Sequence, residues 1–459
     1  MDKARTRSLP VITSNDVKST ALIAPAQRQL GFWSVVALVI GHTTGIGIFL
    51  TPAQLIGARA APALTLGLWL VVGALVVAGA WTFGELAARY PRAGGLYVYL
   101  DEAWGRPVAF LYGWQCLLVM DPGIIAALAL GLSEYLAVLS PAARGRQTAC
   151  ALIVIWVLAL VQIAGLKLSS RALNALTGAK VVAFIVVVAC AFAIGSGSWT
   201  HLVPFAARRP GSPPLRVALA LALTGVFYSY GGFWEASRVA GEVKDVRRDL
   251  PRALALGVTA VTAIYIAITL AFLYLVPAEE ASSAAAFAER AGQVIWGRSG
   301  PPLLAAIVVL SGVPSVMALL FMAPRLYLAM SQDGLFPRGL ATLTASRRAP
   351  WRATALLAAI ASVYVLSGSF GQILAVFLCT AFVFLALAAA GLFVLRRRDS
   401  KSASFRVPAY PVTPLLFVVL TLGAVAIIAA GRPWQALTGF GLVLAGWPVY
   451  GLLARRLSE

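Results

Sequence analysis

Long apolar runs separated by short polar segments fill the chain from about residue 31 to its end. Most runs are as long as the roughly 20 residues that an α-helix needs to cross a bilayer. The pattern therefore predicts an all-α membrane protein with about twelve transmembrane helices. The predicted spans are 31–57, 62–88, 107–139, 148–166, 172–195, 214–240, 250–276, 301–331, 351–368, 370–395, 411–430 and 434–454.

Two of these spans contain glycines and polar residues near the middle of the membrane. The first includes Gly41-His42-Thr43-Thr44-Gly45-Ile46-Gly47-Ile48-Phe49, and the sixth includes Phe227-Tyr228-Ser229-Tyr230-Gly231-Gly232-Phe233-Trp234-Glu235. Glycine costs a helix about 1 kcal/mol relative to alanine. Backbone released from a helix is tolerated in a membrane only where it is buried in protein or lines a cavity. The pattern therefore predicts two broken helices beside a cavity.

The two interruptions open two blocks of five spans each. An odd number of spans inverts the second block relative to the first, as in transporters built from inverted repeats. The alternative is close helix packing through small residues, which is common in membranes. Because the interruptions occupy corresponding positions, we favour the transporter interpretation. The predicted parts are a cytoplasmic tail (1–30), a ten-helix core (31–400, with repeats 31–195 and 214–400), and two additional helices with a short C-terminus (401–459).

Broken helices predict the chemistry of the ligand. Unwinding the first span exposes amides near Gly45, Ile46 and Gly47, which favour a carboxylate. The first half of the sixth span ends in carbonyls that suit an ammonium group. A zwitterionic α-amino acid would satisfy both. The predicted substrate-binding residues are Thr43, Thr44, Gly45, Ile46, Gly47, Phe227, Tyr228, Ser229, Tyr230, Gly231 and Gly232.

Composition and charge narrow the class of protein further. The 459 residues are 60% hydrophobic and only 12% charged, which excludes a soluble enzyme and a disordered chain. We counted Lys and Arg in the tails and loops between the predicted spans, together with the adjoining ends of those spans. Of the 37 residues, 27 lie on the side of the membrane that holds the N-terminus and 9 lie on the opposite side. We therefore attribute the net charge of +20 to the orientation of the chain in the membrane, with both termini in the cytoplasm, and not to nucleic-acid binding.

Catalytic and metal-binding motifs are not apparent in the sequence. The four cysteines are scattered through apolar runs, and there is no CxxC, HExxH or GxSxG motif in context. We expect no cofactor, no metal and no enzymatic activity. A channel would need a continuous polar stripe, which none of the spans shows. The polar N-terminal segment does not resemble a signal peptide, so we expect the first span to direct its own insertion.

Five stretches, in order, resemble the amino acid–polyamine–organocation (APC) transporters, and most closely their L-type amino acid transporter branch. They are Gly45–Phe49; Phe83–Leu86 with Tyr90–Gly95; Tyr230–Phe233; Glu242–Asp245 with Arg248–Pro251; and Arg325–Tyr327 with Asp333–Pro337. The resemblance covers about residues 30–455. It implies the leucine-transporter fold, a 5+5 inverted repeat with helices 1 and 6 broken. Ile46 departs from the family's serine and Val246 from a loop proline, so only the backbone of Ile46 is expected to bind substrate.

Lys180, Asp121 and Tyr228 are candidates for coupling or gating. Lys180 lies in the middle of an apolar span, where a charge costs roughly 2.5–3.5 kcal/mol. In the resembling family, a lysine of helix 5 stands where sodium binds in sodium-coupled relatives. Two roles stay open for Lys180, a proton carrier or a fixed cation that braces helix 1 carbonyls. Tyr228 matches an aromatic gate of the family, with core packing as the alternative.

Three further polar residues leave alternatives open. Asp121, beside Pro122 and Gly123, either couples protons, pairs with a cationic substrate or forms an internal ion pair. For His42, a hydrogen bond within the bundle is favoured over titration. Glu235 either faces the cavity or pairs with Arg238 or Arg325, and pairing is favoured.

The resulting hypothesis is an alternating-access amino acid transporter of the cytoplasmic membrane. We expect neutral L-amino acids, moved by exchange or proton-linked uptake without sodium. The alternative is a transporter of polyamines, organic amines or cationic amino acids with the same fold. The expected partners are the substrate and membrane lipid. No obligatory protein partner is predicted, because Cys150 is expected within the fourth span and not in the outer loop that carries the partner-linking cysteine of mammalian L-type transporters.

Overall fold

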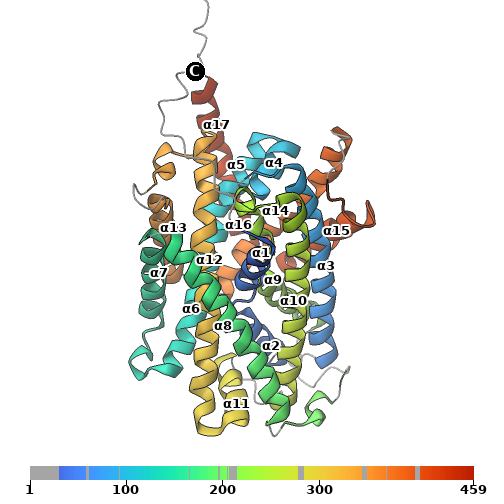
Figure 1. The fold of residues 1–459 in the computed structure, drawn as a ribbon, viewed down its shortest axis with the longest axis vertical. Helices are drawn as coiled ribbons and strands as arrows, with labels where there is room; N and C mark the ends of the chain where they lie inside the picture. Colours follow the sequence, from blue (N-terminus) through green and yellow to red (C-terminus); the bar gives the residue numbers. More distant parts are fainter. Residues whose placement is uncertain are drawn as a thin grey trace, which may run out of the picture.

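The computed structural model of the protein describes residues 30–57, 61–92, 94–164, 166–194, 197–203, 205, 214–277, 284–343, 349–367, 370–398 and 404–458. The predicted N-terminal tail lies outside these residues except for Leu30. The described chain forms a bundle of helices that run mostly along one axis (Figure 1). The α-helices are α1 (Phe32–Thr43), α2 (Gly47–Gly57), α3 (Pro62–Arg89), α4 (Leu96–Trp104), α5 (Arg106–Gln115), α6 (Asp121–Leu139), α7 (Gln147–Ala164), α8 (Leu166–Ala193), α9 (Leu215–Tyr230), α10 (Val246–Leu275), α11 (Ala284–Trp296), α12 (Gly300–Gln332), α13 (Trp351–Ser367), α14 (Phe370–Arg398), α15 (Val412–Gly431), α16 (Pro433–Leu444) and α17 (Gly446–Ser458).

Among the described residues, nine helical segments are long and apolar enough to cross a membrane. Two shorter apolar helices, α1 and α13, stand at positions where spans were predicted. The first predicted span is divided into α1 and α2, and the sixth into α9 and the 3₁₀-helix η5 (Phe233–Glu242). Both interruptions therefore occur where the glycine runs predict them. The helix α11 was not predicted, and the last predicted span is divided between α16 and α17.

A π-helical turn, η2 (Cys116–Met120), joins α5 to α6 in the third predicted span. Pro122 has no N–H to donate to the carbonyl of Leu118, and the Tyr364 hydroxyl donates to that carbonyl instead at 2.9 Å. The amide of Asp121 bonds back to the Cys116 carbonyl, as a π-turn requires. The missing N–H of Pro122 thus accounts for the irregular turn, and Asp121 stands at the end of that turn.

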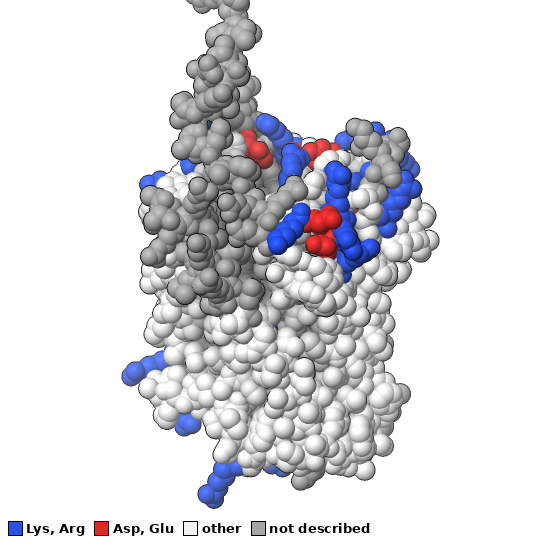
Figure 2. Space-filling view, in the orientation of Figure 1, with Lys and Arg blue, Asp and Glu red and all other residues white. Residues whose placement is uncertain are grey.

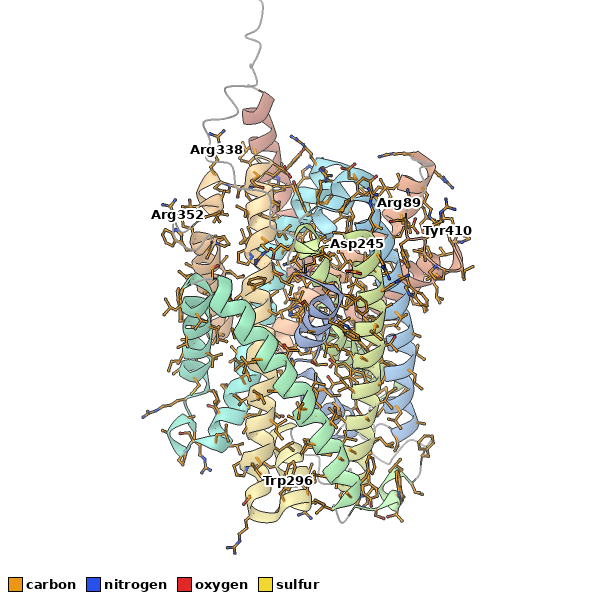
Figure 3. All side chains as sticks on the ribbon, viewed as in Figure 1. Arg89, Asp245, Trp296, Arg338, Arg352 and Tyr410 are labelled. Carbon is orange, nitrogen blue, oxygen red and sulfur yellow. The ribbon has the colours of Figure 1, made fainter. Side chains whose placement is uncertain are left out.

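Charged side chains gather at one end of the visible face, and few show in the middle of that face (Figure 2). The labelled side chains show the same division: Arg89, Asp245, Arg338, Arg352 and Tyr410 lie toward that end and Trp296 toward the other (Figure 3). Many large hydrophobic side chains on the outside of the bundle are exposed, as expected of a surface that faces lipid. The apolar residues of the sequence therefore serve both the core and the outer surface.

A buried carboxylate fastens the end of α3 to α14 and to the segment that follows it. Glu85 is fully buried, and Arg396 donates to its two oxygens from Nε at 2.9 Å and from Nη2 at 2.5 Å. The Val407 amide donates to Oε2 at 2.7 Å, and Arg89 donates from the next turn of α3 at 3.1 Å. One side chain therefore satisfies donors from three segments.

Replacing Glu85 with glutamine should destabilise the protein. The substitution removes the negative charge between two arginines and replaces one of the two acceptor oxygens with an NH2 group that faces other donors. Losing one partner of a buried ion pair typically costs about 3–5 kcal/mol. We expect a decrease of about 3 kcal/mol in the free energy of unfolding, measured by titrating detergent-solubilised protein with SDS.

Glu102→Gln is the matched control for this prediction. Glu102 pairs with Arg92 at the same end of the molecule, but the two side chains are 35% and 58% exposed. Exposed pairs contribute about 0–1 kcal/mol, so this variant should resemble the unsubstituted protein. Equal losses in the two variants would contradict the anchoring role of Glu85.

Candidate functional site

The first interruption separates α1 from α2 over residues 44–46. The Thr44 amide still bonds to the Ile40 carbonyl, and the Gly45 amide turns back to the Thr43 carbonyl. α2 then begins at Gly47, and the first amides of a helix have no acceptor within that helix. The break therefore presents helix-start amides on one side and released carbonyls on the other.

Lys180 occupies the carbonyl side of this break. Its ammonium donates to the carbonyls of Gly41 and Thr44, each at 2.7 Å, and to that of Ser311 at 3.1 Å. Ser311 and Ser315 of α12 add hydroxyl donors to the Thr44 and Gly41 carbonyls, at 3.1 and 3.2 Å. All three ammonium protons thus have acceptors, an arrangement that matches a cation bracing the carbonyls of the broken helix.

The second interruption separates α9 from η5 at two glycines. The Gly231 amide bonds to the Tyr228 carbonyl, which ends α9 with a tight turn. Gly232 has a φ of 96°, in the left-handed region that residues with a Cβ rarely adopt. A Cβ there would also lie 2.2 Å from Cδ2 of His42. Glycine is therefore required here both by the backbone conformation and by the ring of His42.

The two interruptions are in direct contact. An ideal Cβ on Gly47 would lie 2.6 Å from Ser229 Oγ and 3.0 Å from Ser229 Cα, so only glycine allows this approach. Thr51 Oγ1 and Ser229 Oγ share a hydrogen bond of 2.9 Å. The Tyr265 hydroxyl lies 2.8 Å from the Thr43 carbonyl and 2.5 Å from the Ser229 carbonyl, so it links both breaks.

A pocket lies where the two breaks meet. Its walls come from both interruptions and from η2, α6, η5 and α14. The lining residues are His42, Thr43, Gly45, Gly47, Met120, Ile124, Leu128, Tyr228, Ser229, Gly231, Trp234, Phe377, Leu378 and Ala381. Six of the predicted substrate-binding residues are in this set, namely Thr43, Gly45, Gly47, Tyr228, Ser229 and Gly231.

The other five predicted residues lie beside this pocket without lining it. Thr44 turns its hydroxyl to the Ile40 carbonyl, and Ile46 is buried with Cγ2 close to Gly312 of α12. Phe227 and Tyr230 line a smaller neighbouring pocket instead. Gly232 lies against the His42 ring. No described residue of α12 lines the main pocket.

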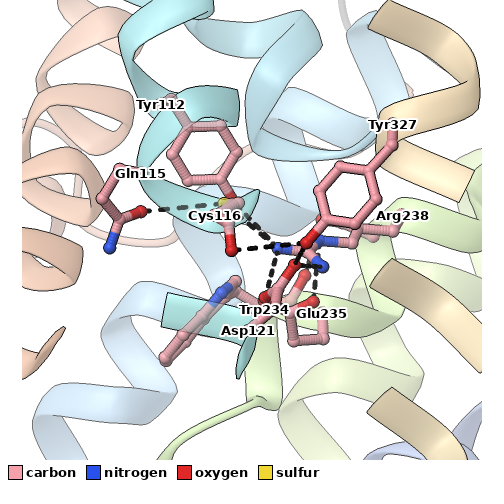
Figure 4. A network of polar contacts seen from close by, with 9 residues as sticks. Tyr112, Gln115, Cys116, Asp121, Trp234, Glu235, Arg238 and Tyr327 are labelled. Carbon is pink, nitrogen blue, oxygen red and sulfur yellow. Dashed lines mark hydrogen bonds and ion pairs between the residues drawn. The ribbon is translucent and has the colours of Figure 1, made fainter. Parts of the chain in front are cut away.

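Asp121 belongs to a buried charge cluster next to the pocket (Figure 4). Its carboxylate receives Arg238 Nη1 at 3.1 Å and Nη2 at 3.3 Å, and the Tyr327 hydroxyl at 2.6 Å. Glu235 Oε2 lies 2.7 Å from Arg238 Nε. Arg325 pairs with Glu242 at 2.7 Å. The geometry therefore matches the internal ion-pair alternative for Asp121 and the Arg238 alternative for Glu235.

His42 lies in the wall of the pocket, and the expected hydrogen bond within the bundle stays a prediction. Its side chain is 6% exposed and lines the pocket, and within the described residues Nδ1 has no hydrogen-bond partner. The backbone turn at Gly232 is in contact with the Cδ2–Nε2 edge of the His42 ring, which brings the ring of a residue of α1 against the second interruption. His42 therefore offers a polar contact within an otherwise largely apolar wall.

Sequence reasoning missed two residues that organise the site. Tyr265 was not singled out, because it is one of several hydroxyl residues in span 250–276 and nothing in the sequence marks it out from them. Arg238 was considered only as a partner of Glu235, although it is 1% exposed and also binds Asp121, 117 positions away. A buried arginine needs anionic partners, but the sequence gives no distance between residues on different helices.

Comparison with known proteins adds an independent finding. A family model described as amino acid permease matches residues 30–452. The serine/threonine exchanger SteT of Bacillus subtilis is 27% identical over 440 residues, covering 94% of this chain and 98% of that protein. The b(0,+)-type amino acid transporter 1 of Homo sapiens is 27% identical over 451 residues, covering 96% of this chain and 90% of that protein.

A third relative, the large neutral amino acids transporter small subunit 2 of Homo sapiens, is 27% identical over 448 residues, covering 93% of this chain and 80% of that protein. These relatives are transporters and an exchanger, so the prediction that the chain is not an enzyme is confirmed. The family model spans nearly the whole described chain, and the apolar helices suit a multi-pass membrane protein. The chain belongs to the amino acid permease family.

Proposed function

We propose that the protein is a secondary transporter that moves neutral L-amino acids across the cytoplasmic membrane by alternating access. The observation that carries the proposal is the pocket at which two interrupted helices meet, with the start of α2 on one side and the end of α9 on the other. Membrane transporters bind substrates at such discontinuous helices near the centre of the bilayer. The family match supports amino acids as the substrate class.

The substrate carboxylate is assigned to the start of α2. Gly45 and Gly47 line the pocket and have no side chain to cover their amides. Helix-start amides and the positive end of the helix dipole both favour an anion. The predicted contacts are the amides near Ile46 and Gly47.

The substrate ammonium is assigned to the end of α9. The carbonyls of Gly41, Thr43 and Thr44 at the first break already accept protein donors from Lys180, Ser315, Tyr265 and Ser311. Each of these three carbonyls has two donors, whereas within the described residues the carbonyls of Tyr228 and Ser229 have one each, from the Gly231 amide and the Tyr265 hydroxyl. A carbonyl oxygen has two lone pairs. The amino group is therefore expected to bind carbonyls of the Phe227–Tyr230 turn, with Tyr228 covering the site as an aromatic gate.

The remaining wall of the pocket favours a neutral side chain. Apolar residues of η2, α6 and α14 line it, namely Met120, Ile124, Leu128, Phe377, Leu378 and Ala381. A cationic amino acid or polyamine remains the second candidate, supported by the acidic residues of the neighbouring cluster. We rank it second because Asp121 is already matched by Arg238 and Tyr327.

We also propose that transport does not depend on sodium. The Lys180 ammonium lies against three backbone carbonyls, a ligand type that would otherwise suit a hard cation. A fixed positive charge there disfavours a second cation at the same place. Exchange and proton-linked uptake are the remaining modes.

The orientation follows from the distribution of charge. Lys and Arg gather at the end of the bundle that carries Arg89, Arg338 and Arg352 (Figures 2 and 3). By the positive-inside rule we assign this end, and with it both chain termini, to the cytoplasm. The inverted-repeat division into 31–195 and 214–400 is likewise part of the proposal, with one interrupted helix opening each half.

A second subunit is not required by the proposal. One relative is itself named as a small subunit, so association with another chain is an outcome to be tested. Cys150 lies in the first turn of α7 and is partly buried. We expect purified protein to transport without a partner chain.

Uptake into proteoliposomes tests the proposed function. We expect the purified full-length protein, reconstituted alone, to accumulate or exchange radiolabelled neutral amino acids, with and without an imposed proton gradient. Replacing potassium with sodium should leave the rate unchanged. Transport of decarboxylated amines but not amino acids would contradict the carboxylate assignment, and a requirement for sodium would contradict the role given to Lys180.

The variant Gly47→Leu should lose substrate binding while still inserting into the membrane. The new side chain collides with Ser229 and fills the pocket at the proposed carboxylate site. We expect no saturable binding by scintillation proximity assay, with a normal elution profile in size-exclusion chromatography.

Gly67→Leu serves as the control for Gly47. Gly67 lies in α3, and a Cβ there would meet no atom within 4 Å. Binding should be retained in this variant. Unchanged binding in Gly47→Leu would remove the first break from the site.

The variant Lys180→Met should weaken substrate binding by about tenfold or more, because three backbone carbonyls at the break lose their charged donor. The measurement is the Kd for the best neutral amino acid. Lys244→Met is the control, since Lys244 is exposed. A Lys180→Met Kd equal to that of the control would show that the break does not need this cation.

A further inference from the structure

A second, smaller pocket lies beside the main one. Residues of α3, α9, η5, α14 and α15 line it, among them Phe233, Phe382, Phe417 and Thr421. Aromatic and aliphatic side chains make up most of this lining. The second pocket therefore suits an apolar group, and the binding mode proposed above leaves it unused.

Trp234 stands between the two pockets. Among the described residues it is the one side chain that lines both of them. It lies in the first turn of η5, directly after Phe233, and it is buried. The indole ring is therefore a wall between the space assigned to the substrate and an adjoining apolar space.

Two aromatic neighbours hold the Trp234 ring in place. The ring centroid of Phe233 lies 5.2 Å away with an interplanar angle of 87°, and that of Phe382 lies 6.5 Å away at 74°. Such edge-to-face arrangements are favoured between aromatic rings. Close-packed interiors also resist changes in the volume of a side chain. A substrate group that needed the space of the indole would therefore have to disrupt these contacts.

The ends of the substrate assigned above leave a definite place for its side chain. With the carboxylate at the start of α2 and the ammonium at the end of α9, the side chain meets the walls from η2, α6, η5 and α14. Trp234 and Phe377 are the bulkiest residues of these walls. The side chain of the substrate is therefore expected to point toward the indole ring.

The free space on either side of the ring is small. The main pocket has a cavity volume of about 30 Å³ and the second pocket one of about 10 Å³. A single water molecule needs roughly 10–15 Å³ of such space. The main pocket is therefore close-fitting, and the adjoining room lies behind Trp234.

We propose that Trp234 sets the upper size of the substrate side chain, so that the protein selects small neutral amino acids over large ones. Side chains of the size of alanine or serine fit in front of the indole ring, and those of leucine or phenylalanine collide with it. The second pocket is the space that a larger side chain would need. The inference rests on the proposed transport function and deepens it by naming the substrate class and the residue that selects it.

The expected discrimination follows from packing alone. One methylene group more or less in a hydrophobic pocket changes specificity by about 10–200-fold. Leucine has three carbon atoms more than alanine. We therefore expect the unsubstituted protein to bind alanine at least about tenfold more tightly than leucine or phenylalanine.

Trp234→Ala tests the role of the wall. The measurement is the Ki of alanine, serine, leucine and phenylalanine, from competition with a radiolabelled amino acid on purified full-length protein. Removing the indole joins the two pockets, so the ratio of the leucine Ki to the alanine Ki should fall by about tenfold or more. A residue with a purely structural role would weaken the binding of all four amino acids alike and leave this ratio unchanged.

Phe417→Ala is the matched control. Phe417 is a buried aromatic residue that lines the second pocket and does not line the main one. Its truncation enlarges the second pocket and removes aromatic packing, but it leaves the indole wall in place. The ratio of the two Ki values should equal that of the unsubstituted protein.

Trp234→Phe covers the case in which Trp234→Ala does not fold, because it keeps an aromatic ring beside Phe233 and Phe382. The phenyl ring is smaller than the indole, so the ratio should fall in the same direction by a smaller factor. An unchanged ratio in folded Trp234→Phe, with the elution profile of the unsubstituted protein, would overturn the inference.

The remaining outcomes separate this inference from the proposed function. Equal Ki values for alanine and leucine in the unsubstituted protein overturn the inference and leave the proposed function standing. An equal fall of the ratio in Phe417→Ala and Trp234→Ala also overturns it, because loss of packing and not loss of the wall would then set the specificity. Failure of the unsubstituted protein to bind an amino acid of any size would instead overturn the proposed function, and the inference with it.

Discussion

The structure of the site depends on satisfying the backbone groups that two helix breaks release inside an apolar bundle. Unpaired carbonyls in such surroundings are costly, and water is not available to bind them. Lys180 resolves this at the first break by donating to Gly41, Thr44 and Ser311 together. Without a donor of this kind the chain would favour a continuous helix at that position, and the start of α2 would not open into a pocket.

Contacts with the first break hold the second break in place. Tyr265 places one hydroxyl between the carbonyls of Thr43 and Ser229, and the close approach of Gly47 to Ser229 brings the two breaks into contact. Gly47 is therefore required by the close approach of the two breaks, and Gly232 is required both by its backbone conformation and by its contact with His42. The substrate pocket is the space left where two interrupted helices touch, and its polar groups are those that protein donors have not already taken.

The buried charged residues are of two kinds. Glu85 joins α3 to α14 with donors from three segments, and the full set of partners leaves it a structural anchor. The cluster of Asp121, Glu235 and Arg238 beside the pocket is different, because two acids share one arginine and, within the described residues, the oxygens of Glu235 accept no hydrogen bond. Burial is similar in the two places, so they differ in the balance of charge and in the number of hydrogen-bond donors.

The sequence by itself determined the bundle of apolar helices and the position of both breaks, because long apolar runs and misplaced glycines are local signals. It also pointed to Lys180 and Asp121, since a charge within an apolar run is visible without a structure. Only the tertiary structure decided what these residues touch: Lys180 meets carbonyls more than 130 positions away, and Asp121 meets Arg238. It also decided that Ile46 and Tyr230 turn away from the main pocket, because side-chain direction at a helix break depends on which neighbouring helices pack against it.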